Sequence, residues 1–93
     1  MPRNPSPKVV NRAVLLYELL RERDVADMES LLRFLRENGE NVSYSALYHT
    51  LTLLERSGVV DRKRFQRRVY WYVKKNIDNI ELRSLLSIRR RTG

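Results

Sequence analysis

The sequence has no cysteine, a single histidine and three glycines among its 93 residues. The lack of cysteine excludes a disulfide scaffold, a cysteine-based zinc site and a thiol nucleophile. One histidine argues against a histidine-rich metal site, and we expect no metal and no other cofactor. No apolar run approaches the roughly 18 residues that span a membrane, and the first residues lack the apolar segment of a signal peptide. We therefore expect one soluble, cytoplasmic domain with no membrane partner.

The sequence also lacks the patterns that accompany catalysis. It has no glycine-rich loop, no paired-carboxylate cleft and no nucleotide-binding motif. Ser45 precedes His49 by about one helical turn, but such a pair has neither an orienting acid nor an oxyanion site. We expect no enzyme and no small-molecule ligand.

Positive charge is in excess, and the excess lies at one end of the chain. Nineteen basic and 11 acidic residues give a formal net charge of +8. Residues 1–58 are balanced, whereas residues 59–93 hold 11 basic and three acidic residues. Seven basic residues and no acidic one fall between Arg62 and Lys75, interleaved with aromatic residues. A solvated face usually mixes both signs, so this run favours a polyanion-binding surface.

Capping residues and helical periodicity predict four helices. A serine or aspartate precedes each periodic segment, and glycines follow the second and the third. The expected N-caps are Ser6, Asp27, Ser43 and Asp78. The expected helices cover residues 7–23, 28–38 and 44–57, and a fourth extends from Asp78 to about Arg90. We expect a flexible arm at 1–6, a single domain at 7–90 and a basic tail end at 91–93.

Two strands are predicted between the third and fourth helices, at 59–64 and 68–73, with a basic turn at 65–67. The second strand alternates: Val69, Trp71 and Val73 lie on one side, and Arg68, Tyr70 and Tyr72 on the other. We assign Trp71 to the core and leave Tyr70 and Tyr72 open. The predicted fold class is mainly α with a small β-hairpin (α+β), in the order helix, helix, helix, hairpin, helix, which is typical of a winged helix-turn-helix.

The third predicted helix has two different faces. Leu47, Leu51 and Leu54 cluster on the side expected to meet the core. The opposite face is expected to carry no acid and no large aliphatic side chain, with Leu53 at its border. Arginine and hydroxyl side chains suit the DNA major groove, although an ordinary surface position stays open for His49. The candidate base-reading residues are Tyr44, Ser45, Tyr48, His49, Thr52 and Arg56.

The segment from Asn41 to Val60 carries a family resemblance. A serine cap, an aliphatic-Tyr-x-Thr-Leu stretch, a Leu-Leu pair and a Gly-aliphatic-Val exit resemble the recognition-helix segment of winged-helix regulators. The segment is most similar to the N-terminal DNA-binding domain of ferric-uptake-regulator-like proteins, and the PadR and MarR groups share the general plan. The resemblance extends over about residues 25–73 and implies a winged-helix fold with Tyr48 facing DNA.

The departures from this family concern metal sensing. The arginine that follows the tyrosine in the family is His49 here, and the metal-sensing histidines and cysteines have no counterpart. We therefore assign no metal residue and expect no second, dimerisation domain.

In winged-helix proteins a basic hairpin forms a wing on the DNA backbone or in the adjacent minor groove. Such contacts are mostly independent of sequence and sensitive to salt. The candidate wing contacts are Arg62, Lys63, Arg64, Gln66, Arg67 and Arg68.

Leucines outside the main apolar stripes lead to a dimer hypothesis. Leu15 and Leu19 lie nearly opposite the main stripe of the first helix, and the fourth helix has two apolar stripes about 130° apart. We predict a homodimer formed by the first and last helices, which would read a pseudo-palindromic site. Scattered surface leucines, or a last helix packed wholly into its own core, are the alternatives. The candidate interface residues are Leu15, Leu19, Leu82, Leu85 and Leu86.

These observations predict a sequence-specific double-stranded DNA-binding transcription regulator, with the helix at 44–57 in the major groove and the wing at 62–68 on the backbone or in the minor groove. The alternative is a winged-helix domain that binds RNA, as in a ribosomal protein, or that binds another protein.

Overall fold

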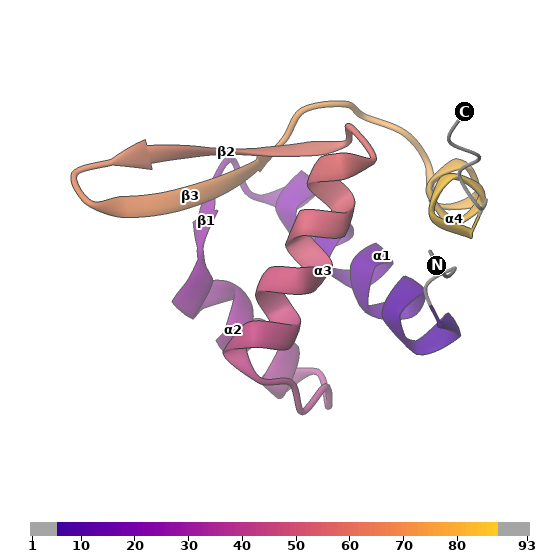
Figure 1. Cartoon of the computed structure of the whole chain (residues 1–93), viewed down its shortest axis with the longest axis horizontal. Helices are drawn as coiled ribbons and strands as arrows, with labels where there is room; N and C mark the ends of the chain where they lie inside the picture. Colours follow the sequence, from indigo (N-terminus) through magenta and orange to yellow (C-terminus); the bar gives the residue numbers. More distant parts are fainter. Residues whose placement is uncertain (1–5, 88–93) are drawn as a thin grey trace, which may run out of the picture.

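The computed structural model describes residues 6–87 as four helices and a three-stranded antiparallel sheet (Figure 1). The elements are α1 (Pro7–Glu22), β1 (Ala26–Asp27), α2 (Met28–Glu37), α3 (Tyr44–Arg56), β2 (Val60–Phe65), β3 (Arg68–Val73) and α4 (Asn79–Ser87). The predicted fold class and element order are confirmed, with one added strand, β1. The predicted arm before Ser6, the end of the fourth helix and the basic tail lie outside the described residues.

The predicted helix caps are all present. The side-chain oxygens of Ser6, Asp27, Ser43 and Asp78 accept backbone N–H groups from three residues further on, at 2.8–3.3 Å. Each bond satisfies a backbone donor that has no partner within its helix. At the other ends of α2 and α3, Gly39 and Gly58 have φ of +84° and +83°, a conformation that favours glycine. Local sequence therefore fixes where these helices begin and end.

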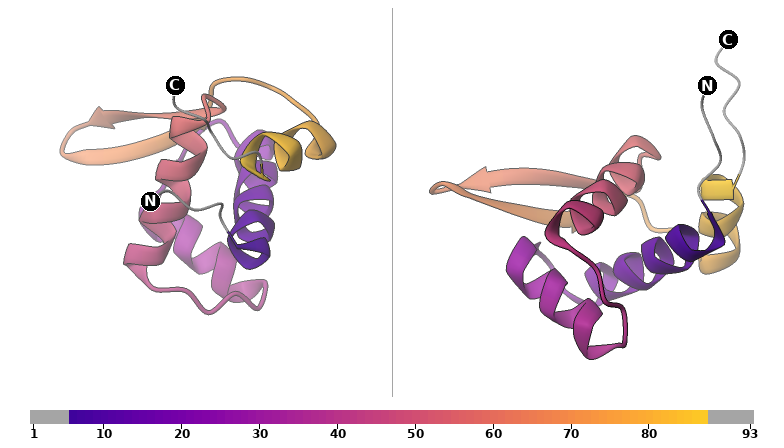
Figure 2. Two further views of the ribbon diagram at one scale, coloured as in Figure 1. Left: turned by 45° about the vertical axis from the view of Figure 1, so that its right-hand side comes forward. Right: turned by 60° about the horizontal axis from the view of Figure 1, so that its bottom comes forward.

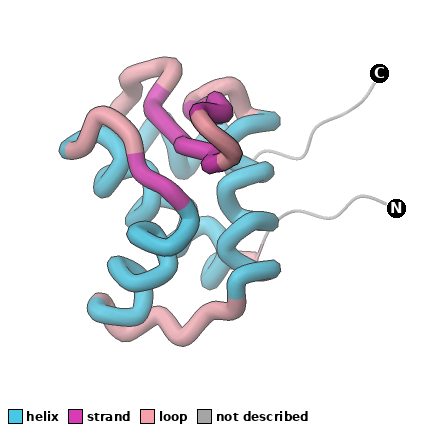
Figure 3. Tube along the Cα trace, turned by 90° about the vertical axis from the view of Figure 1, so that its left-hand side faces the viewer, coloured by secondary structure: helices cyan, strands magenta, loops and turns pink. Residues whose placement is uncertain are grey.

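The core forms around α1, which packs against α3, α4 and β3. Tyr17 of α1 and Trp71 of β3 are its largest fully buried side chains. Leucines from every helix complete it, including Leu31 and Leu35 of α2 and the predicted Leu47, Leu51 and Leu54 of α3. α2 and α3 form the helix-turn-helix, and the strands lie at one end of the group of helices (Figure 3).

The sheet has the order β1-β3-β2, so β3 is its central strand. Val60 pairs with Val73 and Phe65 with Arg68, leaving a two-residue turn at Gln66 and Arg67. The second strand is where it was predicted, at 68–73, whereas the first lies one residue later than predicted, at 60–65. Trp71 is fully buried, as predicted, and Val69 and Val73 pack against the core. The hairpin projects from one side of the molecule and α4 lies on the other (Figure 2).

The predicted dimer leucines are divided between core and surface. Leu19, Leu82 and Leu86 are 6%, 0% and 3% exposed, so their assignment to an open interface is wrong. Leu85 is 41% exposed, and Leu15 is half-buried against the core. α4 packs along α1 and covers the leucines that helical periodicity placed outside the main stripe.

Polar contacts hold α4 against α1. The Asn79 side-chain amide donates to Glu18, and the Arg83 guanidinium donates to Asn11 Oδ1 at 2.8 Å. The two helices therefore run in opposite directions. The buried Tyr17 hydroxyl donates to the Lys75 carbonyl at 2.5 Å and accepts the Ile77 N–H at 2.9 Å. These bonds fix the link between the hairpin and α4.

Candidate nucleic-acid interface

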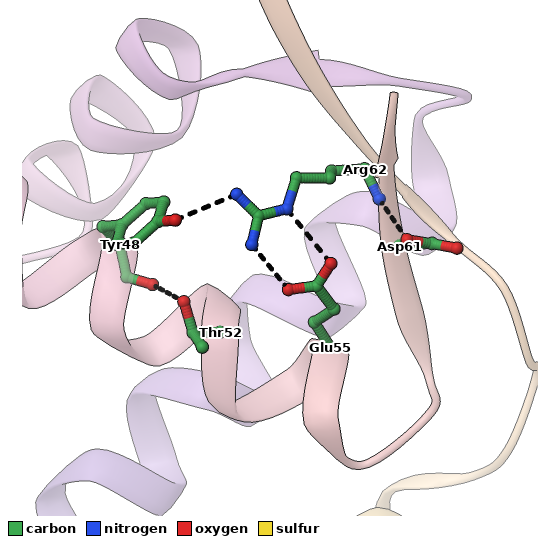
Figure 4. Close-up of polar contacts among 5 residues, drawn as sticks. All are labelled: Tyr48, Thr52, Glu55, Asp61 and Arg62. Atoms are coloured by element: carbon green, nitrogen blue, oxygen red, sulfur yellow. Dashed lines mark hydrogen bonds and ion pairs between the residues drawn. The ribbon is translucent and has the colours of Figure 1, made fainter. Parts of the chain in front are cut away.

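The outer face of α3 is made of the residues predicted to read bases. Tyr44 and Tyr48 are 57% and 43% exposed, although aromatic rings are usually buried. Ser45, His49 and Arg56 are exposed, and Thr52 is half-buried. The Thr52 hydroxyl donates to the Tyr48 carbonyl at 2.8 Å, so it offers DNA an acceptor oxygen and a methyl group (Figure 4). This face therefore presents hydroxyl groups, rings and one guanidinium.

The expectation that this face carries no acid is wrong. Glu55 follows Tyr48 by seven residues, and at 100° per residue it lies about 20° from Tyr48 around the helix. Its carboxylate accepts the Nε–H and an Nη2–H of Arg62 at 3.0 and 2.8 Å (Figure 4). Bidentate pairing of this kind is the strongest geometry for arginine and carboxylate. The acid is thus neutralised by the adjacent strand.

Arg62 is held on several sides. Its Nη1–H group donates to the Tyr48 hydroxyl at 2.9 Å, and its guanidinium carbon lies 4.8 Å from the Trp71 ring centre and 5.5 Å from that of Tyr48. The hydrogen bond with Glu55, and to a lesser extent the bond with Tyr48, raises the pKa of Arg62 above its ordinary value. Arg62 therefore joins the root of the hairpin to α3 and is not a free wing cation.

Arg68 is also paired. Its guanidinium donates to Asp27 Oδ2 at 2.7 Å, which ties the hairpin to the start of α2. Among residues 6–87, Lys63, Arg64 and Arg67 have no acidic partner within 4 Å, and all three are exposed. The predicted wing set therefore separates into two cations that anchor the hairpin and three that face outward beside Gln66.

The hairpin tip and the start of α3 border one hollow of the surface. Tyr44, Arg67, Arg68 and the first residues of α2 line it. At the tip, the Phe65 side chain is 60% exposed; it is absent from the predicted wing contacts because the prediction places it in the turn and not at the end of a strand. Gln66 and Arg67 have φ of +49° and +71°, which is rare for residues other than glycine. The arrangement places cations and an aromatic ring beside the face of α3.

A model of the ferric uptake regulator family matches residues 8–83. The chain belongs to the ferric uptake regulator family. The match extends from the second residue of α1 through the hairpin to Arg83 in α4. It confirms the family that the segment from Asn41 to Val60 resembles. Comparisons with curated proteins and with solved structures give no match. The family consists of metal-responsive transcription regulators that bind DNA through a winged helix.

The described residues offer no candidate site for a metal ion. Residues 6–87 contain no group of three histidine, cysteine or acidic side chains that could hold a metal ion. His49, the single histidine, is exposed on α3. Within the same residues no helix is long and apolar enough to cross a membrane.

Proposed function

We propose that this member of the ferric uptake regulator family is a sequence-specific double-stranded DNA-binding protein that regulates transcription. In this proposal α3 enters the major groove, and the hairpin lies on the backbone or in the adjacent minor groove. The observation that carries it is the exposed face of α3, with Tyr44 and Tyr48 uncovered beside a hairpin whose outward cations are Lys63, Arg64 and Arg67.

Affinity and specificity come from different elements in this proposal. The outward hairpin cations attract any phosphate backbone, and each contact releases counterions. On α3, neutral hydroxyl and ring groups outnumber the single exposed cation, Arg56, so discrimination between sequences depends on short-range contacts. His49 contacts a base edge or a phosphate from the same face.

We also propose that the protein acts with DNA in the cytoplasm, as a homodimer and not as an enzyme. Two exposed apolar residues of α4, Ile80 at 80% and Leu85 at 41%, support self-association, together with the half-buried Leu15. Two copies related by a two-fold axis would present two recognition helices to half-sites about one turn of DNA apart.

The test begins with selection of bound duplexes from a random pool. The selected duplex, a scrambled duplex of equal length and a structured RNA are then titrated at about 50 and 200 mM salt. We expect preference for the selected duplex and affinity that falls steeply with salt. Preference for the RNA, or affinity that ignores salt, would overturn the proposal.

A further inference from the structure

An acidic side chain on a DNA-facing surface requires an explanation. Glu55 lies beside Tyr48 on the outer face of α3, where a free carboxylate would repel phosphates. Glutamate can also accept a hydrogen bond from the cytosine amino group in the major groove. Both oxygens of Glu55, however, already accept N–H groups of Arg62. The charge of the carboxylate is therefore paired within the protein.

Three of the five side-chain N–H donors of Arg62 are also used within the protein. Three of its N–H groups reach Glu55 Oε1, Glu55 Oε2 and the Tyr48 hydroxyl at 2.8–3.0 Å. Its guanidinium also lies over the Trp71 ring, and its backbone N–H donates to Asp61 Oδ1 at 2.8 Å. A phosphate could reach only its two remaining N–H groups, and would meet a guanidinium whose charge is already paired with Glu55. Arg62 therefore differs from Arg64, two residues further along the same strand, which is exposed and has no acidic partner among residues 6–87.

The contact with Arg62 also decides whether the Tyr48 hydroxyl donates or accepts a hydrogen bond with an outside partner. A phenol oxygen that accepts a hydrogen bond from arginine directs its own proton elsewhere, because arginine has no acceptor. The Tyr48 side chain is 43% exposed, so that proton is available to an outside partner.

We infer that Arg62 is a positioning residue: it masks Glu55 and presents the Tyr48 hydroxyl to DNA as a hydrogen-bond donor. The base atoms that accept such a bond in the major groove are a purine N7, guanine O6 and thymine O4. The amino groups of adenine and cytosine are excluded, because they are donors themselves. This inference rests on the proposed function and assigns to Arg62 a role distinct from that of the outward cations.

A double-mutant cycle separates masking from direct phosphate contact. The proteins are the wild type, Arg62→Met, Glu55→Gln and the double variant, and the measurement is the dissociation constant for the selected duplex across a salt series. We expect Arg62→Met to weaken binding about a hundredfold: about tenfold because it uncovers a charge beside DNA, and about tenfold because the Tyr48 hydroxyl is no longer oriented. The double variant should regain about tenfold and keep the wild-type salt slope (the slope of log affinity against log salt concentration), because no charge is left uncovered. Its remaining loss of about tenfold should equal that of Tyr48→Phe.

Arg64→Met is the matched control. It should lower the salt slope by about 0.9, the value for one phosphate contact, and Glu55→Gln should not rescue it. Two results would overturn the inference: a double variant that binds as weakly as Arg62→Met, or rescue of Arg64→Met by Glu55→Gln to the same extent. Weak binding of every duplex by the wild type would instead contradict the proposed function.

A second cycle tests the hydroxyl. Tyr48→Phe should weaken binding of the selected duplex about tenfold in the wild type and less than about twofold in the Arg62→Met/Glu55→Gln background. Equal losses in both backgrounds would contradict the positioning role. The fluorescence of Trp71, the only tryptophan, reports the unfolding of every variant, so binding is compared only where each protein is folded.

Discussion

The guanidinium of Arg68 donates a hydrogen bond to the Asp27 carboxylate at 2.7 Å and so joins the hairpin to the start of α2. The same carboxylate accepts the Ser30 N–H at 3.1 Å as the N-cap of α2. The hydrogen bonds from Ser30, and to a lesser extent the pairing with Arg68, hold the pKa of Asp27 below its ordinary value of 3.8. One side chain thus caps a helix and anchors the wing.

This arrangement predicts a stability that depends on pH. The pKa of Asp27 is lower in the folded protein than in the unfolded chain. Its contribution to the free energy of unfolding is therefore complete above about pH 5, and it is lost as the pH falls through the pKa that Asp27 has in the folded protein. Asp27→Asn keeps a capping group and removes the charge. It should lower the free energy of unfolding by about 1 kcal/mol at pH 7, and by much less at pH 2.5.

Urea denaturation at the two pH values measures this difference. Glu37→Gln, at the exposed C-terminal end of α2, serves as the control for loss of one acid. A deficit of the Asp27→Asn variant that is the same at both pH values would contradict the assignment.

The turn of the wing should be easy to stabilise. Both of its residues have positive φ, as a type I′ turn requires, yet neither Gln66 nor Arg67 is asparagine or glycine. Gln66→Asn should raise the free energy of unfolding by about 0.5–1 kcal/mol and leave the salt dependence of DNA binding unchanged, because it removes no charge. Arg67→Gly should also stabilise the hairpin but weaken binding of every duplex, because it removes an outward cation. Thermal unfolding and duplex titration check the two effects separately, and equal DNA affinity of both variants would contradict the role of Arg67.

The Tyr17 hydroxyl should matter for stability far more than its size suggests. Tyr17→Phe removes the acceptor of the buried Ile77 N–H and the donor to the Lys75 carbonyl. Leaving these groups unpaired should cost about 1–3 kcal/mol in the free energy of unfolding. Tyr44→Phe is the control. The Tyr44 ring is exposed, so loss of its hydroxyl should leave the free energy of unfolding nearly unchanged. Similar denaturation midpoints for the two variants would contradict the bridging role.

The dimer proposal now depends on the exposed side of α4. The double variant Ile80→Glu/Leu85→Glu should sediment as a monomer with the helix content of the wild type, because both side chains are exposed. Leu82→Glu should instead unfold the protein, since Leu82 is fully buried. A wild type that sediments as a monomer, or a double variant that keeps the mass of a dimer, would contradict self-association through this surface.

Most of the fold was predictable because local signals fix it. Serine and aspartate caps, glycines after helices, and the alternation around Trp71 act within a few residues of sequence. The strand β1 gives no such signal, since it has two residues and exists only because Ala26 lies opposite Trp71. The burial of Leu19 and Leu82 was missed for a related reason. Helical periodicity describes each helix alone, and these leucines are covered only when α4 packs on α1.

The residues that form the site could be predicted from the sequence, but the ion pairs that some of them form could not. The exposed residues of α3 and the basic hairpin follow from residue type and position. Which cations remain free depends on contacts between residues far apart in sequence, such as Arg68 with Asp27, and no pattern of charge along the chain shows them. Glu55 is an exception, because a complete helical wheel places it beside Tyr48.

The division of labour between α3 and the wing is the central claim, and one comparison tests it most directly. The affinities of Arg67→Ala and Tyr48→Phe are measured for the selected and the scrambled duplex at two salt concentrations. Arg67→Ala should weaken both duplexes by the same factor and lower the salt slope by about 0.9, whereas Tyr48→Phe should weaken only the selected duplex, about tenfold. If the two variants lose affinity in the same pattern, the recognition helix and the wing do not have the separate roles described.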